Sequence, residues 1–321
     1  MRMKKATKGP GTVVEFMERF PDEAACMEFL RKTRWPNGFV CPRCKGRESV
    51  TITTRRLEQC KACRRQTSLT AGTVLEGTRK PLRLWFLAMF FLGRHKTGIS
   101  ALQLQKDLGL GSYKTAWTWM HKLRSALSER AEFRLTGLVE ADETYVGRKG
   151  KPGSGGRALS PGKNAIAAVI EDRGERAGAL RMAVVPAASQ AELGPFVRGA
   201  IDQAKAVVVS DDWSGYGDLA QHGADHCPIV QGDPKNAAKL LPWSHITFSN
   251  LKGWLRGTFH GVSPKHLHRY LQEFVVSSRV CGEAIVRHLL LLAQLAISLG
   301  FILKVDAPPV RWHCFAYAAT G

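Results

Sequence analysis

Apolar residues near the start of the chain recur every three or four positions. This spacing extends through residues 13–35 and predicts helical structure, because side chains three and four apart share one face of a helix. Pro36, Asn37 and Gly38 end the pattern, as turn-forming residues do. We therefore expect residues 1–36 to be an N-terminal helical segment.

A second helical block is predicted over residues 81–129, with breaks near Gly98 and at residues 109–111. The short stretch before the second break is amphipathic, and Ser112 is suited to cap the helix that follows. Two helices joined in this way form a helix-turn-helix, whose second helix enters the major groove of DNA. An ordinary helical hairpin fits the same pattern. We assign residues 78–130 to a helix-turn-helix DNA-binding region.

From about residue 135 the pattern changes to short runs rich in β-branched residues, which predict strands. Strands are expected at residues 138–146, 165–170, 180–185 and 206–210, and helices at residues 190–204 and 240–260. Three strands, a helix and a fourth strand follow the order of a ribonuclease-H-like α/β domain, although many mixed α/β folds share it. We assign residues 135–274 to such a catalytic domain.

The first two of these strands are separated by residues 147–163, which are rich in Gly, Lys, Arg and Pro. This composition predicts a flexible hairpin loop. Its positive charges favour a contact with DNA, and a solvated hairpin accounts for them equally well.

The net charge of the chain says more about its binding partners than its hydrophobic content does. Lys and Arg number 47 against 27 Asp and Glu, which gives a formal net charge of +20. Such an excess favours polyanionic partners, because neutralising phosphates releases their condensed counterions. A solvated basic surface without a nucleic-acid partner is the plain alternative.

Two segments bear on localisation. Residues 1–12 are basic and lack the apolar run of a secretory signal. Residues 289–303 are almost wholly apolar but shorter than the roughly 20 residues that a membrane span needs. We interpret this second segment as a buried helix or an abnormal tail, and expect a cytoplasmic protein without a membrane anchor.

Four of the eight cysteines form two C-x-x-C pairs, Cys41 with Cys44 and Cys60 with Cys63. Two such pairs complete a tetrahedral thiolate site for Zn²⁺, and their separation is typical of four-cysteine zinc sites. Residues 37–70 are therefore predicted to form a zinc ribbon with a structural zinc ion; redox-active dithiols are the alternative. The ribbon has three candidate roles, binding DNA, binding a partner or stabilising the N-terminus, and its many basic residues favour DNA.

Acidic side chains in the predicted strands supply candidate catalytic groups. Asp142 lies within one predicted strand, and Asp211 lies at the C-terminal end of an apolar strand, where ligands of α/β sheets collect. A carboxylate inside a strand is costly unless it is hydrogen-bonded, exposed or holding a cation. The helix predicted at residues 240–260 places His245 and Lys252 on one face.

Several of these segments resemble a known family. The residues that carry the resemblance are 141–147 (ADETYVG), 211–216 (DDWSGY), 249–252 (SNLK) and 257–267 (GTFHGVSPKHL). The chain resembles the bacterial insertion-sequence transposases that pair an N-terminal zinc ribbon with a DDE domain. Among them it is similar to the group whose third catalytic residue is Asn, Glu or His and is followed by a Lys. The resemblance covers roughly residues 13–274.

The resemblance implies a catalytic set of Asp142, Asp211, His245 and Lys252. It implies two Mg²⁺ or Mn²⁺ ions, with Asp142 bridging both, Asp211 on one and His245 on the other, and Lys252 at the DNA phosphate near the scissile bond. Because histidine is a softer ligand than glutamate, we expect tolerance of Mn²⁺ or preference for it. A structural His245, with Glu143 or Asp212 completing the site, is the alternative.

Basic and polar residues in two regions are candidates for DNA contact. In the second helix of the predicted helix-turn-helix they are Lys114, Thr115, Thr118, His121 and Lys122. After the third catalytic position they are Arg256, Lys265, His266 and Arg269. The latter alternate with Trp254, Phe259 and Tyr270, and the mixture suits a DNA strand held by stacking together with phosphate contacts.

The expected function is that of a transposase that binds the terminal inverted repeats of its element, cleaves the strand at each end and joins it to target DNA. The resemblance implies at least a dimer on paired ends, with double-stranded DNA as the partner and no small-molecule cofactor. It also implies a bacterial protein associated with the nucleoid.

The last 47 residues depart from the family's pattern. Residues 275–321 form an apolar, leucine-rich tail where family members have an aromatic and arginine-rich ending. A reading-frame shift near residue 275 is our hypothesis, and its expected consequence is a copy that is inactive or poorly folded. The two rival functions are a catalytically dead DNA-binding regulator and a nuclease of the same fold without strand joining.

Overall fold

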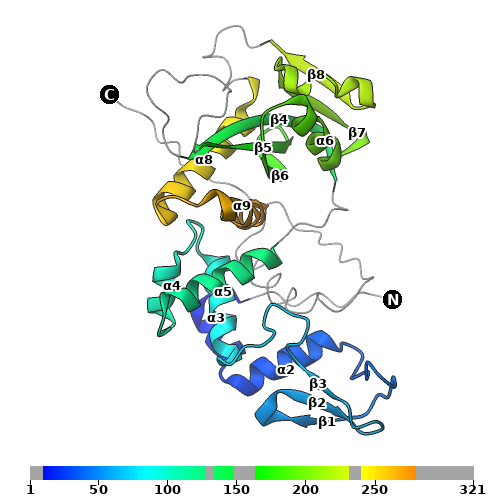
Figure 1. Cartoon of the computed structure of the whole chain (residues 1–321), viewed down its shortest axis with the longest axis vertical. Helices are drawn as coiled ribbons and strands as arrows, with labels where there is room; N and C mark the ends of the chain where they lie inside the picture. The colour runs from blue at the N-terminus through cyan, green and yellow to red at the C-terminus, as the bar shows by residue number, and fades with distance from the viewer. Residues whose placement is uncertain (1–9, 128–133, 148–162, 231–239, 280–321) are drawn as a thin grey trace. The chain divides into compact units, whose positions relative to one another are not determined.

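The computed structural model describes residues 10–127, 134–147, 163–230 and 240–279 (Figure 1). Contacts within the chain divide these residues into two compact units. The first unit contains the residues up to Leu127, and the second contains those from Arg134 to Arg279.

The first unit begins with two helices, α1 (Val13–Arg19) and α2 (Glu23–Arg34). The single helical stretch expected here is therefore divided. Pro21 disfavours helical geometry in the residue before it, and Asp22 caps the new helix by accepting a 2.8 Å hydrogen bond from the Ala25 N–H.

A small antiparallel sheet follows, with strand order β1-β2-β3. Its elements are β1 (Ser49–Ile52), η1 (Thr53–Arg55), β2 (Leu57–Cys60) and β3 (Gln66–Ser68). Glu58 of β2 is fully buried and accepts hydrogen bonds from the hydroxyls of Ser49 (2.6 Å) and Thr51 (2.8 Å). It also pairs with Arg31 of α2 (3.1 Å). This buried carboxylate ties the sheet to α2.

Three further helices complete the first unit: α3 (Leu82–Arg94), α4 (Ala101–Asp107) and α5 (Tyr113–Ala126). The breaks between them fall where they were predicted, and Gly98 and Gly109 adopt left-handed φ angles of 78° and 60° at these turns. Trp85 of α3 and Trp119 of α5 stack with ring centroids 3.8 Å apart. The stack joins the first and last of the three helices.

The second unit is a mixed α/β domain around a five-stranded sheet of order β6-β5-β4-β7-β8. The strands are β4 (Leu135–Gly147), β5 (Lys163–Asp172), β6 (Ala177–Val185), β7 (Ile201–Asp211) and β8 (Asp225–Ile229). β4, β5 and β6 pair antiparallel, whereas β7 runs parallel to both β4 and β8. Four of these strands were predicted. The fifth, β8, was not, because its short polar sequence lacks the alternation of apolar and polar residues that indicates a strand.

Helices cover both faces of this sheet. One face packs against α6 (Gln190–Ala200) and the 3₁₀ turns η2 (Ser214–Tyr216) and η3 (Ala220–His222). The other packs against α8 (Pro242–Phe259) and α9 (Pro264–Arg279). Helix α6 ends four residues before the predicted boundary, because the chain enters β7 directly at Ile201.

The aromatic residues of α8 and α9 lie in the core of the second unit. Trp254 and Tyr270 are 9% and 8% exposed, and the Phe259 ring lies 4.7 Å from Trp254 and 4.9 Å from Tyr270, centroid to centroid. The prediction that these rings stack on DNA is therefore wrong. Their helical spacing reflects packing between α8 and α9. This packing is favourable because it removes the apolar surface of the rings from water.

Helix α9 continues beyond residue 274, and Val275 is buried in the same core. The remainder of the tail, residues 280–321, lies outside the described residues, as do residues 148–162 of the hairpin loop predicted at residues 147–163. Within the described residues, no helix combines the length and the apolar character that crossing a bilayer requires.

Candidate functional site

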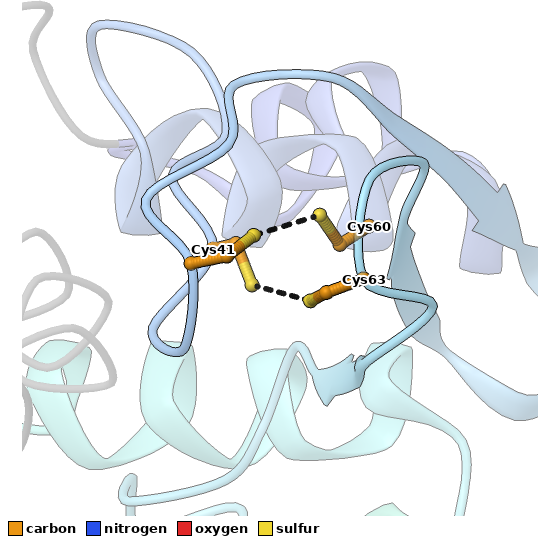
Figure 2. A group of neighbouring side chains, drawn as sticks. Cys41, Cys60 and Cys63 are labelled. Carbon is orange, nitrogen blue, oxygen red and sulfur yellow. Dashed lines mark hydrogen bonds between the residues drawn. The ribbon is translucent and has the colours of Figure 1, made fainter.

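The four cysteines predicted to bind zinc converge in the first unit. Their sulfur atoms all lie within 4.8 Å of one another. The Cys41 and Cys63 sulfurs are 3.6 Å apart, as are those of Cys44 and Cys60. Figure 2 shows the side chains of Cys41, Cys60 and Cys63 pointing toward a common centre. Four convergent thiols are the donor set of a structural zinc site, so the residues fit this ion.

The two C-x-x-C turns share one backbone geometry. Lys45 and Arg64, which follow the second cysteine of each pair, both adopt a left-handed φ of 61°. The Lys45 N–H donates to the Cys41 carbonyl and the Arg64 N–H to the Cys60 carbonyl, both at 3.0 Å. A Cβ on Gly46 would lie 3.3 Å from the Cys60 sulfur, so glycine leaves room for the thiol. The chelating geometry is thus encoded in short local turns.

The backbone also favours ionisation of one thiol. Hydrogen bonding from the Cys44 backbone is the largest influence on Cys41 and lowers the pKa of its thiol to about 6, although burial acts in the opposite direction. Zinc is bound by the thiolate form of cysteine, so the lowered pKa of Cys41 suits a metal ligand.

The two predicted catalytic aspartates lie on neighbouring parallel strands of the second unit. The register pairs Ala141 of β4 with Ser210 of β7, so Asp142 and Asp211 each occupy the next position along their strands. Ala141 and Val208 are buried on the α6 face of the sheet. Because side chains alternate along a strand, Asp142 and Asp211 belong to the opposite face, which α8 and α9 cover.

The helix that carries the other two predicted catalytic residues is anchored to this same face by Glu140. This residue is 3% exposed, and its carboxylate accepts hydrogen bonds from the Trp243 N–H (3.2 Å) and the Ser244 N–H (2.7 Å) at the start of α8. Burial raises the pKa of Glu140, and these N–H donors oppose that rise. The sequence analysis missed Glu140, although its position two residues before Asp142 puts both carboxylates on one face.

Within α8, the predicted catalytic residues lie beside the buried stripe. His245 is exposed and Lys252 is half-buried. Burial lowers the pKa of Lys252, and the negative charge of Asp142 counteracts this effect. The structure therefore brings Lys252 within electrostatic reach of the first aspartate.

Glu143 and Asp212 are the alternative third ligands that were predicted from the sequence. Glu143 is buried on the α6 side, where it accepts a 2.9 Å hydrogen bond from the Tyr216 hydroxyl. Burial raises the pKa of Tyr216 well above its usual value, and the negative charges of Glu143, Asp142 and Asp211 add to the effect. Asp212 is exposed and lies in a bend directly after the end of β7.

The aspartates and His245 are less tightly grouped than the cysteines. Among the residues that the structure describes, the four cysteines are the one set of three or more potential metal ligands whose donor atoms all lie within 4.8 Å of one another. The register of β4 and β7 places Asp142 and Asp211 at equivalent positions. The hydrogen bonds of Glu140 hold the start of α8 against the same face of the sheet.

Helix α5 presents part of the predicted DNA-contacting set to solvent. Lys114, Thr118 and Lys122 are exposed at intervals of four residues, and Thr115 is half-buried beside them. His121 instead lies in the interior, only 2% exposed, with its ring centroid 4.0 Å from that of Trp117. A ring buried to this extent cannot reach a base edge, so His121 does not belong with the surface residues.

The remaining predicted contacts lie on α8 and α9. Arg256 and Lys265 are exposed, and His266 and Arg269 are half-buried. Desolvation lowers the pKa of His266, and the neighbouring cations Lys265 and Arg269 lower it further. Lys265, His266 and Arg269 therefore lie close together near the start of α9, while Arg256 belongs to α8.

Both units match known protein families. Residues 134–276 match the ISXO2-like transposase domain, and residues 21–66 match the transposase zinc-ribbon domain. The two matches together cover more than half of the 321 residues and follow the order that the sequence motifs predicted.

A relative from Halobacterium salinarum carries the description "Uncharacterized protein in transposable element ISH50". It is 29% identical over 282 residues, which is 82% of this chain and 93% of the relative. The predicted resemblance is confirmed by these matches: the chain belongs to the insertion-sequence DDE transposases that carry an N-terminal zinc ribbon.

Proposed function

We propose that this transposase binds duplex DNA at the ends of its element, hydrolyses one strand at each end and joins the freed strand to target DNA. The observation that carries the proposal is the equivalent placement of Asp142 and Asp211 on neighbouring parallel strands, on the face covered by α8. A sheet with three antiparallel strands followed by two parallel ones supports a ribonuclease-H-like fold for the domain.

Asp142, Asp211 and His245 are the residues that would hold two Mg²⁺ or Mn²⁺ ions. The carboxylate oxygens of the two aspartates are the hard donors that these ions prefer, and one imidazole nitrogen is compatible with Mn²⁺. When bound, such a pair of cations supplies Lewis-acid stabilisation to in-line displacement at phosphorus.

In the first reaction, the oxygen of a water molecule forms a bond to phosphorus as the bond to the 3′-oxygen breaks. The products are a 3′-hydroxyl and a 5′-phosphate. In the second, this 3′-hydroxyl displaces a 3′-oxygen from a target phosphate. Lys252 neutralises charge on the scissile phosphate, a role supported by its electrostatic coupling to Asp142.

Recognition of the element ends falls to the first unit in this proposal. Helices α4 and α5 form the helix-turn-helix, and exposed residues of α5 contact DNA. The zinc ribbon adds a second basic surface, with Arg43, Lys45 and Arg47 next to its first cysteine pair. Two element ends must react together, so the active form holds at least two copies of the chain on paired ends.

The test is Mn²⁺-dependent cleavage of a duplex that contains the element end, followed by strand transfer with pre-cut ends. We expect Asp142→Ala to reduce both reactions by about a thousandfold or more, since several kcal/mol of stabilisation depend on this ligand. Asp212→Ala, which removes the exposed neighbour of Asp211, is the matched control and retains activity.

The rival functions give different results in these assays. A DNA-binding regulator shifts the duplex in a gel but neither cuts nor joins it. A nuclease produces hydrolysis products and no joined product. Full activity of Asp142→Ala would refute the proposed site.

A further inference from the structure

A basic cavity opens in the first unit between α5 and the segment that precedes α3. Its volume is about 370 Å³. One wall is formed by α5, through Lys114, Thr118 and Lys122, and the other by residues 77–80, through Arg79 and Lys80. The sequence analysis singled out the α5 residues, but residues 77–80 were not among its candidates for DNA contact.

Both walls are fixed by a single tryptophan, Trp85. Its indole N–H donates a 2.7 Å hydrogen bond to the Thr78 hydroxyl, and its ring stacks on Trp119 of α5 at 3.8 Å. Trp85 is 2% exposed, so this junction is part of the core. The cavity is therefore preformed and does not depend on a bound partner for its shape.

Backbone contacts hold the shorter wall in place as well. The Thr78 N–H donates to the Leu75 carbonyl (3.1 Å), and the Lys80 N–H donates to the Thr78 hydroxyl (3.3 Å). The Lys80 carbonyl accepts a 3.3 Å bond from Arg56. These bonds fix the backbone of residues 78–80 and leave the Arg79 and Lys80 side chains exposed at the cavity.

The charge of the lining has one sign. Four cationic side chains, Arg79, Lys80, Lys114 and Lys122, line the cavity, and none of the described lining residues is acidic. The Lys122 ammonium lies 6.0 Å from the centre of the Trp85 ring, so it is held over the floor of the cavity. A concave site lined by one sign of charge concentrates ions of the other sign.

From this arrangement we infer that the cavity binds neighbouring backbone phosphates of duplex DNA, held between α5 and residues 77–80. The inference rests on the proposed DNA-binding function and deepens it. It also changes the role of Lys114, Thr118 and Lys122: because their side chains line a phosphate site, they position the duplex and do not read base edges. Arg79 and Lys80 join the DNA-binding residues.

The experiment measures binding of the full chain to two labelled duplexes of equal length, one with the element end and one of scrambled sequence, over a range of KCl concentrations. The variant is Arg79→Gln/Lys80→Gln. The control is Lys32→Gln/Lys205→Gln, which removes the same charge at two exposed lysines already paired with Glu28 and Asp202. Circular dichroism verifies that all variants are folded.

We expect Arg79→Gln/Lys80→Gln to weaken binding to both duplexes by the same factor and to reduce the slope of log affinity against log salt by about 2, since each lost phosphate contact contributes about 0.9. The control keeps the wild-type slope. Lys122→Gln is expected to reduce the slope by about 1, again equally on both duplexes.

Two results would overturn the inference. A slope unchanged from wild type excludes phosphate binding at the cavity. A loss confined to the element-end duplex means that these residues read sequence. If the wild-type chain itself binds neither duplex, both the proposed DNA-binding function and the phosphate site fail; wild-type binding with an unaffected variant contradicts the cavity alone.

Discussion

The cysteine cluster of the zinc ribbon and the proposed catalytic site of the second unit are built in opposite ways. In the ribbon, two short turns of the same geometry each supply two thiols, and all four sulfurs lie within 4.8 Å of one another. In the second unit, Asp142, Asp211 and His245 come from two strands and a helix that are far apart in sequence. One site is organised by local turns, and the other depends on strand register and on the Glu140 anchor.

This difference predicts how each site fails. A ribbon that lacks its ion loses the interaction that holds its turns together, so loss of metal is loss of fold. The sheet of the second unit buries an apolar core on both faces, so a change in the proposed catalytic residues should remove chemistry and preserve the fold. The predictions below test this contrast, from the largest effect to the smallest.

The largest effect is expected from removing zinc, by chelation or by Cys63→Ser. Structural zinc contributes roughly 10–16 kcal/mol of apparent binding free energy in zinc-finger peptides, so the ribbon should unfold. Thermal melts followed by circular dichroism should lose the transition of the first unit and keep that of the second. Cys227→Ser, at an exposed cysteine of the second unit, is the control and should melt like wild type. Retention of both transitions after chelation would show that the cysteines are not structurally required.

A smaller effect is expected at His245. His245→Ala should reduce cleavage about a hundredfold, which corresponds to some 3 kcal/mol of transition-state stabilisation, and should leave the melting temperature unchanged because the side chain is exposed. His245→Glu restores a ligand but a harder one, so cleavage in Mg²⁺ should rise relative to Mn²⁺ by roughly tenfold, or about 1.4 kcal/mol. Parallel rate measurements in the two ions check the ratio. Wild-type rates in His245→Ala would mean that this histidine is not a ligand.

The smallest effect is expected at Glu140, which anchors α8 without belonging to the metal site. Glu140→Ala leaves the buried N–H groups of Trp243 and Ser244 without their acceptor, at a cost of about 2 kcal/mol in unfolding free energy. Because α8 carries His245 and Lys252, kcat should fall while DNA affinity is retained. Glu140→Gln keeps one acceptor oxygen and should recover part of both losses. Urea melts and single-turnover cleavage measure the two quantities, and an unchanged kcat in a destabilised Glu140→Ala would show that the anchor is purely structural.

The sequence indicated the ribbon with little ambiguity, because chelation by C-x-x-C pairs is a property of adjacent residues. It also indicated the helix breaks at Gly98 and Gly109 and four of the five strands of the second unit. Prediction from the sequence was wrong for residues whose type is common at DNA-binding surfaces but whose side chains are buried. Trp254, Tyr270 and His121 looked like surface groups that bind DNA, and all three are buried. Polar and aromatic residues at helical spacing do not reveal which face of a helix a neighbouring element covers.

By itself, then, the sequence determined the family, the four zinc ligands and the strands that carry Asp142 and Asp211. These features follow from motifs and periodicities within short stretches of chain. Tertiary structure alone decided that Glu140 holds the start of α8, that Glu143 turns to Tyr216 on the far face, and that residues 77–80 form a cavity with α5. Each of these pairs residues distant in sequence, and which of them meet is set by strand register and core packing, which local pattern does not encode.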